Sequence, residues 1–245
     1  MQRIVFKGRV TPTIHTISIP AYSLTIEDAN LKTVINTEVT NNDVTVTVGV
    51  EKYDPGTISE LARRAIRIVR AATDLVSFAT GKGLNFSLED VTLPDGKSGS
   101  PDFDYANARK LCTSYQLKTF ASVLPIALEQ DVSMALSDLT DTLTQPDRCA
   151  VNCGRVVETL RAVIDRNPDR EKAWATMQTQ LNLSKSYLKL ITDNAQSHRH
   201  GDYLEIDAKV GEDIRDRTWT IMNRFFEYRK RGDKQLPVAD FPVLG

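Results

Sequence analysis

The order of hydrophobic and polar positions predicts a strand-rich first part and a helical second part. Residues 1–50 contain short apolar runs, and residues 44–48 alternate Val and Thr most clearly, a period of two that favours a half-buried strand. Asn41, Asn42 and Asp43 precede this run, and such residues tolerate the left-handed backbone of tight turns. We therefore expect a hairpin here, in a sheet with one face in solvent and the other against a helix.

A helical period follows and supplies that helix. Apolar residues recur at helical spacing through about Thr80, and Thr57 with Glu60 has the spacing of an N-terminal capping box. The glycines of residues 81–83 end the period. Alternating apolar residues at 84–88 then predict a strand that returns to the sheet.

Three arginines of this predicted helix share one face. Arg63, Arg67 and Arg70 have the required spacing, which fits either a solvated face or a stripe that binds phosphate or an RNA backbone. The chain of 245 residues has a formal net charge of −1. It therefore has no overall basic field, and any site for an anion must be local.

Residues 93–102 are dense in Gly, Ser, Pro and Asp, a composition typical of a linker. We predict an α+β fold with a β-rich N-terminal domain and its covering helix at 1–93. An all-α antiparallel helical bundle is expected at 104–231, with an extended tail at 232–245.

Within the second part, apolar residues recur at spacings of three and four. Pro125 is expected to split or kink the first helical segment, and further breaks are expected around Pro146 and Pro168. Asp169 and Ser184 are candidate N-caps of the helices that follow.

Most of the candidate chemistry lies in residues 190–203. Two of the three histidines of the chain, His198 and His200, flank Arg199. Histidine acts as acid or base near neutral pH, and the planar guanidinium of arginine stabilises an oxyanion or a phosphorane. Further groups in the window are suited to orient an imidazole: Asn194, Asp193 and Asp202.

This set of groups leaves three interpretations open. It fits metal-independent RNA cleavage, in which a base removes the 2′-hydroxyl proton and the arginine stabilises the charge at phosphorus. It fits simple binding of phosphate or a nucleotide. It also fits a structural helix end before Gly201, because cationic groups interact favourably with the C-terminus of a helix. A metal site at His198 and His200 is disfavoured because no third ligand is evident.

The other features of the sequence point to a cytoplasmic protein without a cofactor. Cys112, Cys149 and Cys153 include no C-x-x-C pair, so free thiols are expected instead of a zinc site. No apolar run approaches the roughly 18 residues of a membrane span. The N-terminus has no signal-peptide pattern.

The second part resembles a HEPN helical bundle. The resemblance rests on Glu158 with Arg161 on one helix, on the run from His200 through Gly201 to Tyr203, and on the amphipathic helix that follows. HEPN proteins characteristically carry an arginine, four to six residues and then a histidine, often within His-Gly-x-Tyr. The arginine is missing here, since residues 193–195 are Asp, Asn and Ala. Arg199 is the nearby guanidinium.

The resemblance implies an RNA-cleaving effector or its inactive relative. His200 would act as general base or acid and Arg199 would stabilise phosphate charge, with Asn194 and His198 assisting. The substrate-binding residues would be Asp193, Asp202, Tyr203, Glu158 and Arg161.

The resemblance also implies a homodimer through the bundle and RNA or a nucleotide as partner, and it leaves open a regulatory protein partner. The N-terminal half is similar in layout to the β-rich domains before such bundles in bacterial abortive-infection-type proteins, which act in stress or phage defence. The alternative is a non-catalytic module that binds nucleotide, RNA or a protein.

Overall fold

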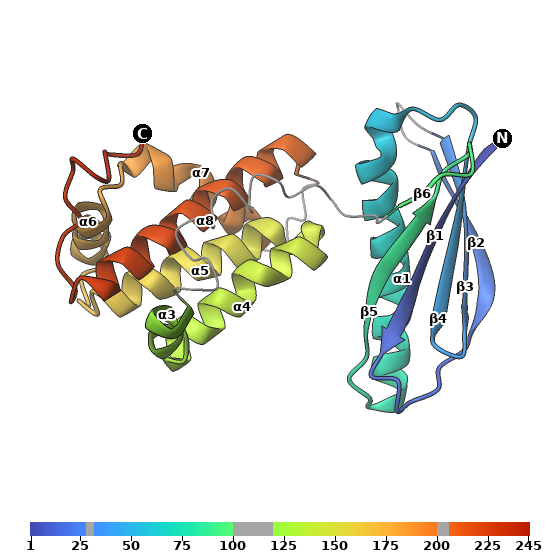
Figure 1. Cartoon of the computed structure of the whole chain (residues 1–245), viewed down its shortest axis with the longest axis horizontal. Helices are drawn as coiled ribbons and strands as arrows, with labels where there is room; N and C mark the ends of the chain where they lie inside the picture. Colours follow the sequence, from blue (N-terminus) through green and yellow to red (C-terminus); the bar gives the residue numbers. More distant parts are fainter. Residues whose placement is uncertain (28–31, 100–119, 200–205) are drawn as a thin grey trace. The chain divides into compact units, whose positions relative to one another are not determined.

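The computed structural model describes residues 1–27, 32–99, 120–199 and 206–245. The chain divides into two compact units, Met1–Phe103 and Asp104–Gly245, and each is described by itself. The first holds a sheet and one long helix, and the second is helical (Figure 1). The predicted α+β class is confirmed.

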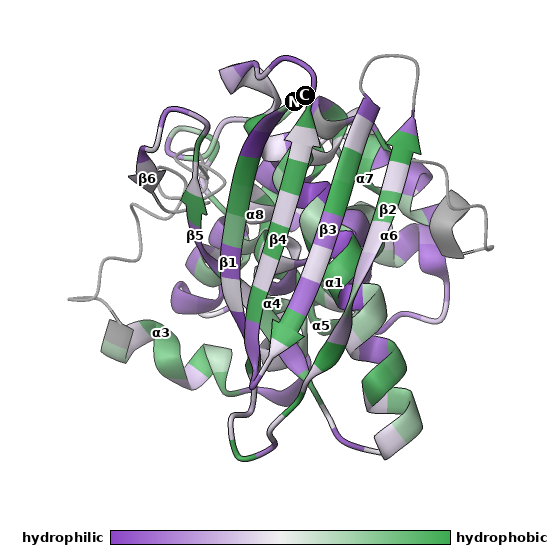
Figure 2. Ribbon diagram, turned by 90° about the vertical axis from the view of Figure 1, so that its right-hand side faces the viewer, coloured by the Kyte–Doolittle hydropathy of each residue, from purple (hydrophilic) through white to green (hydrophobic). Residues whose placement is uncertain are grey.

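The first unit is a six-stranded antiparallel sheet with the order β2-β3-β4-β1-β5-β6. The long helix α1, Ile58–Thr80, covers one face of it (Figure 1). Figure 2 views the sheet from its other side, and the hydropathy of the residues varies along each strand. The strands are β1 Gln2–Thr11, β2 Ile19–Glu27, β3 Lys32–Thr40, β4 Asp43–Val50, β5 Asn85–Thr92 and β6 Ser98–Gly99.

The core of this unit lies between α1 and the sheet, as the alternation predicted. Ile4 and Phe6 of β1 are fully buried, whereas Arg3 and Lys7 beside them in the strand are exposed. The strand β5 returns to pair with β1, so that strand prediction is confirmed.

The predicted hairpin turn is confirmed, and the side chain of Asn42 also binds the connection between β1 and β2. Asn41 and Asn42 have φ of 52° and 75°, the left-handed backbone between β3 and β4. The side chain of Asn42 accepts from the backbone N–H of Ile17 and donates to the carbonyl of His15 at 2.7 Å. Asn42 is 4% exposed, so it also ties the β1–β2 connection to the hairpin.

The predicted capping box at the start of α1 is wrong. Thr57 makes no side-chain capping bond. Its hydroxyl instead donates to the carbonyl of Asp54 at 2.7 Å, because the 3-10 turn Pro55–Thr57 precedes the helix and is itself capped by Asp54. The end of α1 at Gly81, with φ of 66°, agrees with the prediction.

The arginines of α1 do not form one uniform exposed face. Arg67 is exposed and Arg63 is half-buried. The Arg70 guanidinium lies 5.2 Å from the centroid of the Phe86 ring. Arg64, next to Arg63, is only 7% exposed and donates to Glu60 at 3.1 Å.

The second unit is a helical bundle. The predicted break near Pro125 is displaced, because Pro125 lies inside α3 and the next helix starts after Glu129. As predicted, the side chains of Asp169 and Ser184 accept hydrogen bonds from backbone N–H groups of the helices that follow them. The described elements are α3 Phe120–Ala127, α4 Gln130–Thr144, a 3-10 turn Pro146–Arg148, α5 Cys149–Ile164, α6 Arg170–Leu181, α7 Lys185–Arg199 and α8 Ala208–Lys230.

Contacts between the helices fix their directions. Asp138 of α4 pairs with Arg155 of α5 at 3.3 Å, and Asp131 pairs with Arg166 at 3.1 Å, so α4 and α5 are antiparallel. The Cys149 sulfur lies 3.4 Å from the carbonyl oxygen of Gly211. The starts of α5 and α8 therefore lie at the same end of the bundle.

The C-terminal tail, predicted only to be extended, packs into the helical unit. Leu236 is 1% exposed and belongs to the bundle core. Its backbone N–H donates to the carbonyl of Gln180 at 3.0 Å. Further on, Leu244 forms a parallel bridge with Leu183. The tail thus contributes to the packing of the helical unit.

Candidate functional site

The predicted catalytic residues flank or follow the end of α7. His198 and Arg199 belong to α7 by their backbone, but their side chains are outside what the structure describes. His200, Asp202 and Tyr203 lie outside the described residues. The geometry that can be stated is therefore that of the two helices on either side, α7 and α8.

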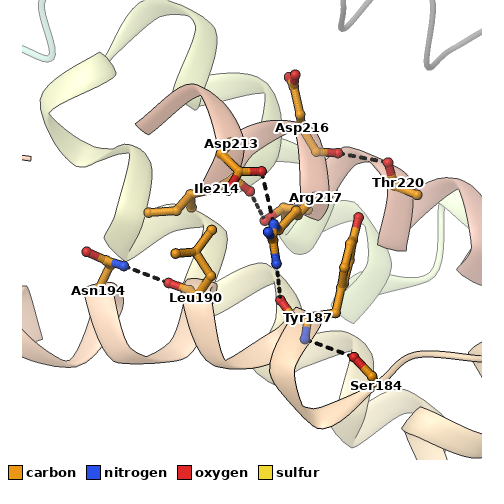
Figure 3. A network of polar contacts seen from close by, with 10 residues as sticks. Ser184, Tyr187, Leu190, Asn194, Asp213, Ile214, Asp216, Arg217 and Thr220 are labelled. Atoms are coloured by element: carbon orange, nitrogen blue, oxygen red, sulfur yellow. Dashed lines mark hydrogen bonds and ion pairs between the residues drawn. The ribbon is translucent and has the colours of Figure 1, made fainter. Parts of the chain in front are cut away.

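The last turns of α7 are anchored by their apolar positions. Ile191 is fully buried and Ala195 is 2% exposed. Between them, Asp193 is exposed, with its carboxylate 3.9 Å from the ammonium of Lys189. The side-chain amide of Asn194 donates to the carbonyl of Leu190 at 2.7 Å (Figure 3). Of the predicted assistants, Asn194 thus bonds to its own helix.

Arg217 of α8 joins the two helices. Its Nε donates to Asp213 one turn earlier at 2.9 Å, and its Nη1 donates to the backbone carbonyl of Tyr187 at 3.3 Å. The guanidinium also lies 4.9 Å from the centre of the Tyr187 ring (Figure 3), a distance at which a cation is attracted by the ring. Arg217 thus links the first turn of α7 to α8. Arg224, two turns further along α8, donates to the carbonyls of Leu181 and Asn182 just before α7, so the two helices are antiparallel.

Burial shifts the pKa of one ionisable group on α7 and of another on α8. Burial raises the pKa of the Tyr187 phenol, so it remains neutral at pH 7. Burial also raises the pKa of the Asp216 carboxyl, opposed by the charge of Arg215 and reinforced by Glu212 and Asp213. At the start of α8, the negative charges of Glu212 and Asp213 therefore disfavour ionisation of Asp216, and the positive charge of Arg215 favours it.

Arg215 is the residue of this region that sequence reasoning missed. It is only 7% exposed, on the first turns of α8, and its charge favours the ionised forms of Asp216 and Cys153. A buried guanidinium thus lies at the α5–α8 interface. The charged run of residues 212–217 was visible in the sequence, but only packing shows which of its members is buried.

Glu158 and Arg161 belong to another part of the bundle. Arg161 donates to Glu158 at 3.4 Å, and the other carboxylate oxygen of Glu158 is held by Arg170 of α6. The Arg161 guanidinium lies 5.7 Å from the centre of the Trp174 ring. Glu158 is nine residues beyond Cys149, about 13 Å along a helix. The pair thus joins α5 to α6 instead of lining the bundle end where α8 begins.

Two surface hollows among the described residues contain none of the predicted site residues. One has a volume of about 370 Å³ and is lined by Glu129, Gln130, Asp131, Val163 and Arg166. The other lies beside Asn182 and Gln235. Within the described part of the chain, no group of three or more His, Cys, Asp or Glu side chains is placed to hold a metal ion. No described helix is long and apolar enough to cross a membrane.

An antiparallel sheet unit with one covering helix, followed by a helical bundle, defines the class of this protein as a two-unit α+β protein. Residues 4–99 match the N-terminal domain, and residues 118–230 the C-terminal domain, of a family described as Domain of unknown function (DUF8168). The two matches follow in chain order and together span most of the chain, which therefore belongs to this family. No curated protein and no solved structure matched the chain. The resemblance to HEPN bundles stays a prediction.

Proposed function

We propose that the helical unit is a HEPN-like, metal-independent ribonuclease whose site is built on the end of α7. In this mechanism, His200 acts as general base or acid on the RNA 2′-hydroxyl and Arg199 stabilises the charge that develops at phosphorus. His198 assists and Asn194 fixes the local geometry. The protein would act in the cytoplasm, in bacterial stress or phage defence.

The observation that supports this proposal is the fixed pairing of α7 with α8. Arg217 binds the backbone of Tyr187 and the carboxylate of Asp213 at once. Through it, the two helices that flank residues 200–205 are held together. A catalytic segment gains most when the elements that carry it are rigid, because its groups must be held in the productive geometry.

A second candidate function is a non-catalytic module that binds nucleotide, RNA or a protein partner. The environment of Asn194 favours it. The arginine of the HEPN pattern is missing at 193–195, and Asn194 uses its side-chain donor within its own helix. Such a module would retain the homodimer and the regulatory partner that the resemblance implies.

The test is cleavage of a mixed RNA pool in excess chelator, with wild type beside His200→Ala. The proposal expects cleavage by wild type that leaves 2′,3′-cyclic phosphate ends and is lost in the variant. RNA that is bound by wild type but left intact would contradict the ribonuclease and support the binding module.

The chain supplies a matched control. His15 is the third histidine of the sequence, and the hydrogen bonds described at this residue involve its backbone N–H and carbonyl groups. His15→Ala should therefore cleave like wild type. Equal loss in His15→Ala and His200→Ala would show that the activity does not depend on the proposed site.

A further inference from the structure

Two cysteines of α5 touch one another inside the bundle. Cys149 is the first residue of the helix and Cys153 follows one turn later. Their sulfur atoms are 3.9 Å apart, and the residues are 5% and 0% exposed. Residues four apart lie on one face of a helix, so the helix itself keeps the two thiols together.

The pair lies at the interface between α5 and α8. The Cys149 sulfur is also 3.4 Å from the carbonyl oxygen of Gly211. The hydrogen bond between the two sulfur atoms and burial raise the pKa of the Cys153 thiol well above its usual range, opposed by Thr218 and by the charge of Arg215. Cys153 is thus held as a neutral thiol, whereas Cys149 retains a small exposed surface at the start of the helix.

We propose that Cys149 and Cys153 form a redox-active dithiol, which a hydroperoxide converts into a disulfide within α5. The Cys149 sulfur attacks one peroxide oxygen, the O–O bond breaks, and Cys149 becomes a sulfenic acid. The other oxygen takes the thiol proton and leaves as an alcohol or as water. The Cys153 sulfur then attacks the sulfenic sulfur, an S–S bond forms, and one water is released. In sum, two thiols lose two hydrogen atoms, and hydrogen peroxide is reduced to two waters.

The bond requires the first turn of α5 to tighten. A disulfide needs Cβ atoms about 3.5–4.5 Å apart, whereas positions four apart on a regular helix have Cβ atoms about 5–6 Å apart. Cys149 is the first residue of α5, and helix ends fray most readily, so the adjustment falls at the end of the helix. The sulfur atoms must approach by about 2 Å to reach the usual S–S distance of about 2.05 Å. That approach moves the Cys149 sulfur relative to the Gly211 carbonyl, so oxidation changes the contact between α5 and the first turns of α8.

The consequence for the site rests on the proposed function, whereas the disulfide itself does not. The segment that carries His200 directly precedes α8 in the chain. A change in the packing of the first turns of α8 would therefore alter RNA cleavage or binding. The disulfide is measured by mass and by thiol labelling, so its result stands whether or not the protein cleaves RNA.

The experiment uses the full chain in a Cys112→Ser background, which removes the third cysteine. The folded protein is treated with hydrogen peroxide, denatured, labelled with iodoacetamide and weighed intact. We expect loss of two hydrogen atoms and no label, reversed by dithiothreitol. Cys153→Ala in the same background should stop at a Cys149 sulfenic acid that dimedone traps, and Cys149→Ala should give neither product.

Two results would overturn the proposal. The first is full labelling of both thiols after a peroxide dose that oxidises a model dithiol peptide. The second is a disulfide in wild type that disappears in Cys112→Ser, which would assign the reactive pair to Cys112. Circular dichroism of each variant distinguishes a chemical effect from a failure to fold.

Discussion

Arg224 of α8 donates to the carbonyl of Pro242 in the C-terminal tail at 2.7 Å. The same guanidinium donates to the carbonyls of Leu181 and Asn182 at 2.8 and 2.9 Å. The buried Arg224 side chain therefore joins α8, the end of α6 and the tail. Burial lowers the pKa of Arg224, yet arginine remains charged in proteins, so these are charge-assisted hydrogen bonds.

Arg224→Ala should strongly destabilise the helical unit. The substitution leaves three carbonyl oxygens without their donor, and hydrogen bonds to charged groups contribute about 1.5–3 kcal/mol each without being additive. We expect a loss of about 3 kcal/mol in the free energy of unfolding. Both tryptophans, Trp174 and Trp219, lie in this unit, so urea unfolding followed by tryptophan fluorescence measures its stability.

Two further variants sharpen this result. Arg224→Lys should recover only part of the loss, because an ammonium lacks the planar fork that reaches several acceptors. Arg224 and Arg231 both lie over the Phe241 ring, 6.0 and 5.3 Å from its centroid, but Arg231 is more exposed. Arg231→Ala should cost no more than about 0.5 kcal/mol. Equal effects of Arg224→Ala and Arg231→Ala would contradict the anchoring role of Arg224.

The local pattern of residues predicts most helices and strands of this protein, but it does not predict contacts between residues far apart in the sequence. The turn at Asn41 and Asn42 and the cap at Asp169 depend on neighbours within a few residues, so the sequence carries their signal. Arg224 meets acceptors 18 to 43 residues away, and no periodicity marks such a pairing. The pairing of Glu158 with Arg170 of α6 likewise joins two helices, and no local pattern predicts it.

Asn42 allows a test of the hairpin in which the backbone is left unstrained. Asn42→Gly keeps the left-handed backbone accessible but removes the side-chain bonds to Ile17 and His15. One buried and one partly buried backbone group then lose their partners, and we expect a cost of about 1–3 kcal/mol. Asn41→Gly, where φ is 52° and the residue is exposed, should change stability by no more than a few tenths of a kcal/mol.

Because both tryptophans lie in the other unit, hydrogen exchange of the β3 and β4 amides is the measurement for these two variants. Faster exchange in Asn42→Gly than in Asn41→Gly is the expected result. Similar exchange in both variants would show that the turn conformation alone, and not the Asn42 side chain, holds this part of the sheet.

Asp216 should make the stability of the helical unit depend on pH. Burial raises the pKa of its carboxyl in the folded protein, so the folded state binds the proton more readily than the unfolded state. The ionised carboxylate then disfavours folding above the folded pKa, and this effect disappears as the pH falls below the unfolded value of about 3.9. Asp216→Asn should accordingly raise stability at pH 7.

The measurement is the urea midpoint of wild type and Asp216→Asn between pH 3 and pH 8. The advantage of the variant should shrink toward low pH. Asp213→Asn is the matched comparison, because the Asp213 carboxylate accepts from Arg217 at 2.9 Å and its loss should destabilise at pH 7. An Asp216→Asn variant less stable than wild type at pH 7 would show that its ionised form has a favourable partner.

The missing arginine of the HEPN pattern gives the last prediction, which depends on the proposed ribonuclease. The pattern places a guanidinium at 193–195. Ala195 is 2% exposed and has no room for one, whereas Asn194 is half-buried and Asp193 is exposed. Removing one donor to a developing oxyanion typically costs about 10²–10³ in rate. Asn194→Arg should therefore raise RNA cleavage, by tenfold or more where wild type is weak.

Asp193→Arg is the control for a general gain in positive charge. Asp193→Arg changes the net charge more than Asn194→Arg does. Asp193 is exposed, one residue before Asn194, and its carboxylate lies near the ammonium of Lys189. Both variants should bind RNA more tightly at low salt, but only Asn194→Arg should increase the single-turnover cleavage rate at saturating protein. Adding His200→Ala should abolish that increase, because the guanidinium stabilises a transition state that His200 must first generate. A gain that survives His200→Ala would separate cleavage from this site.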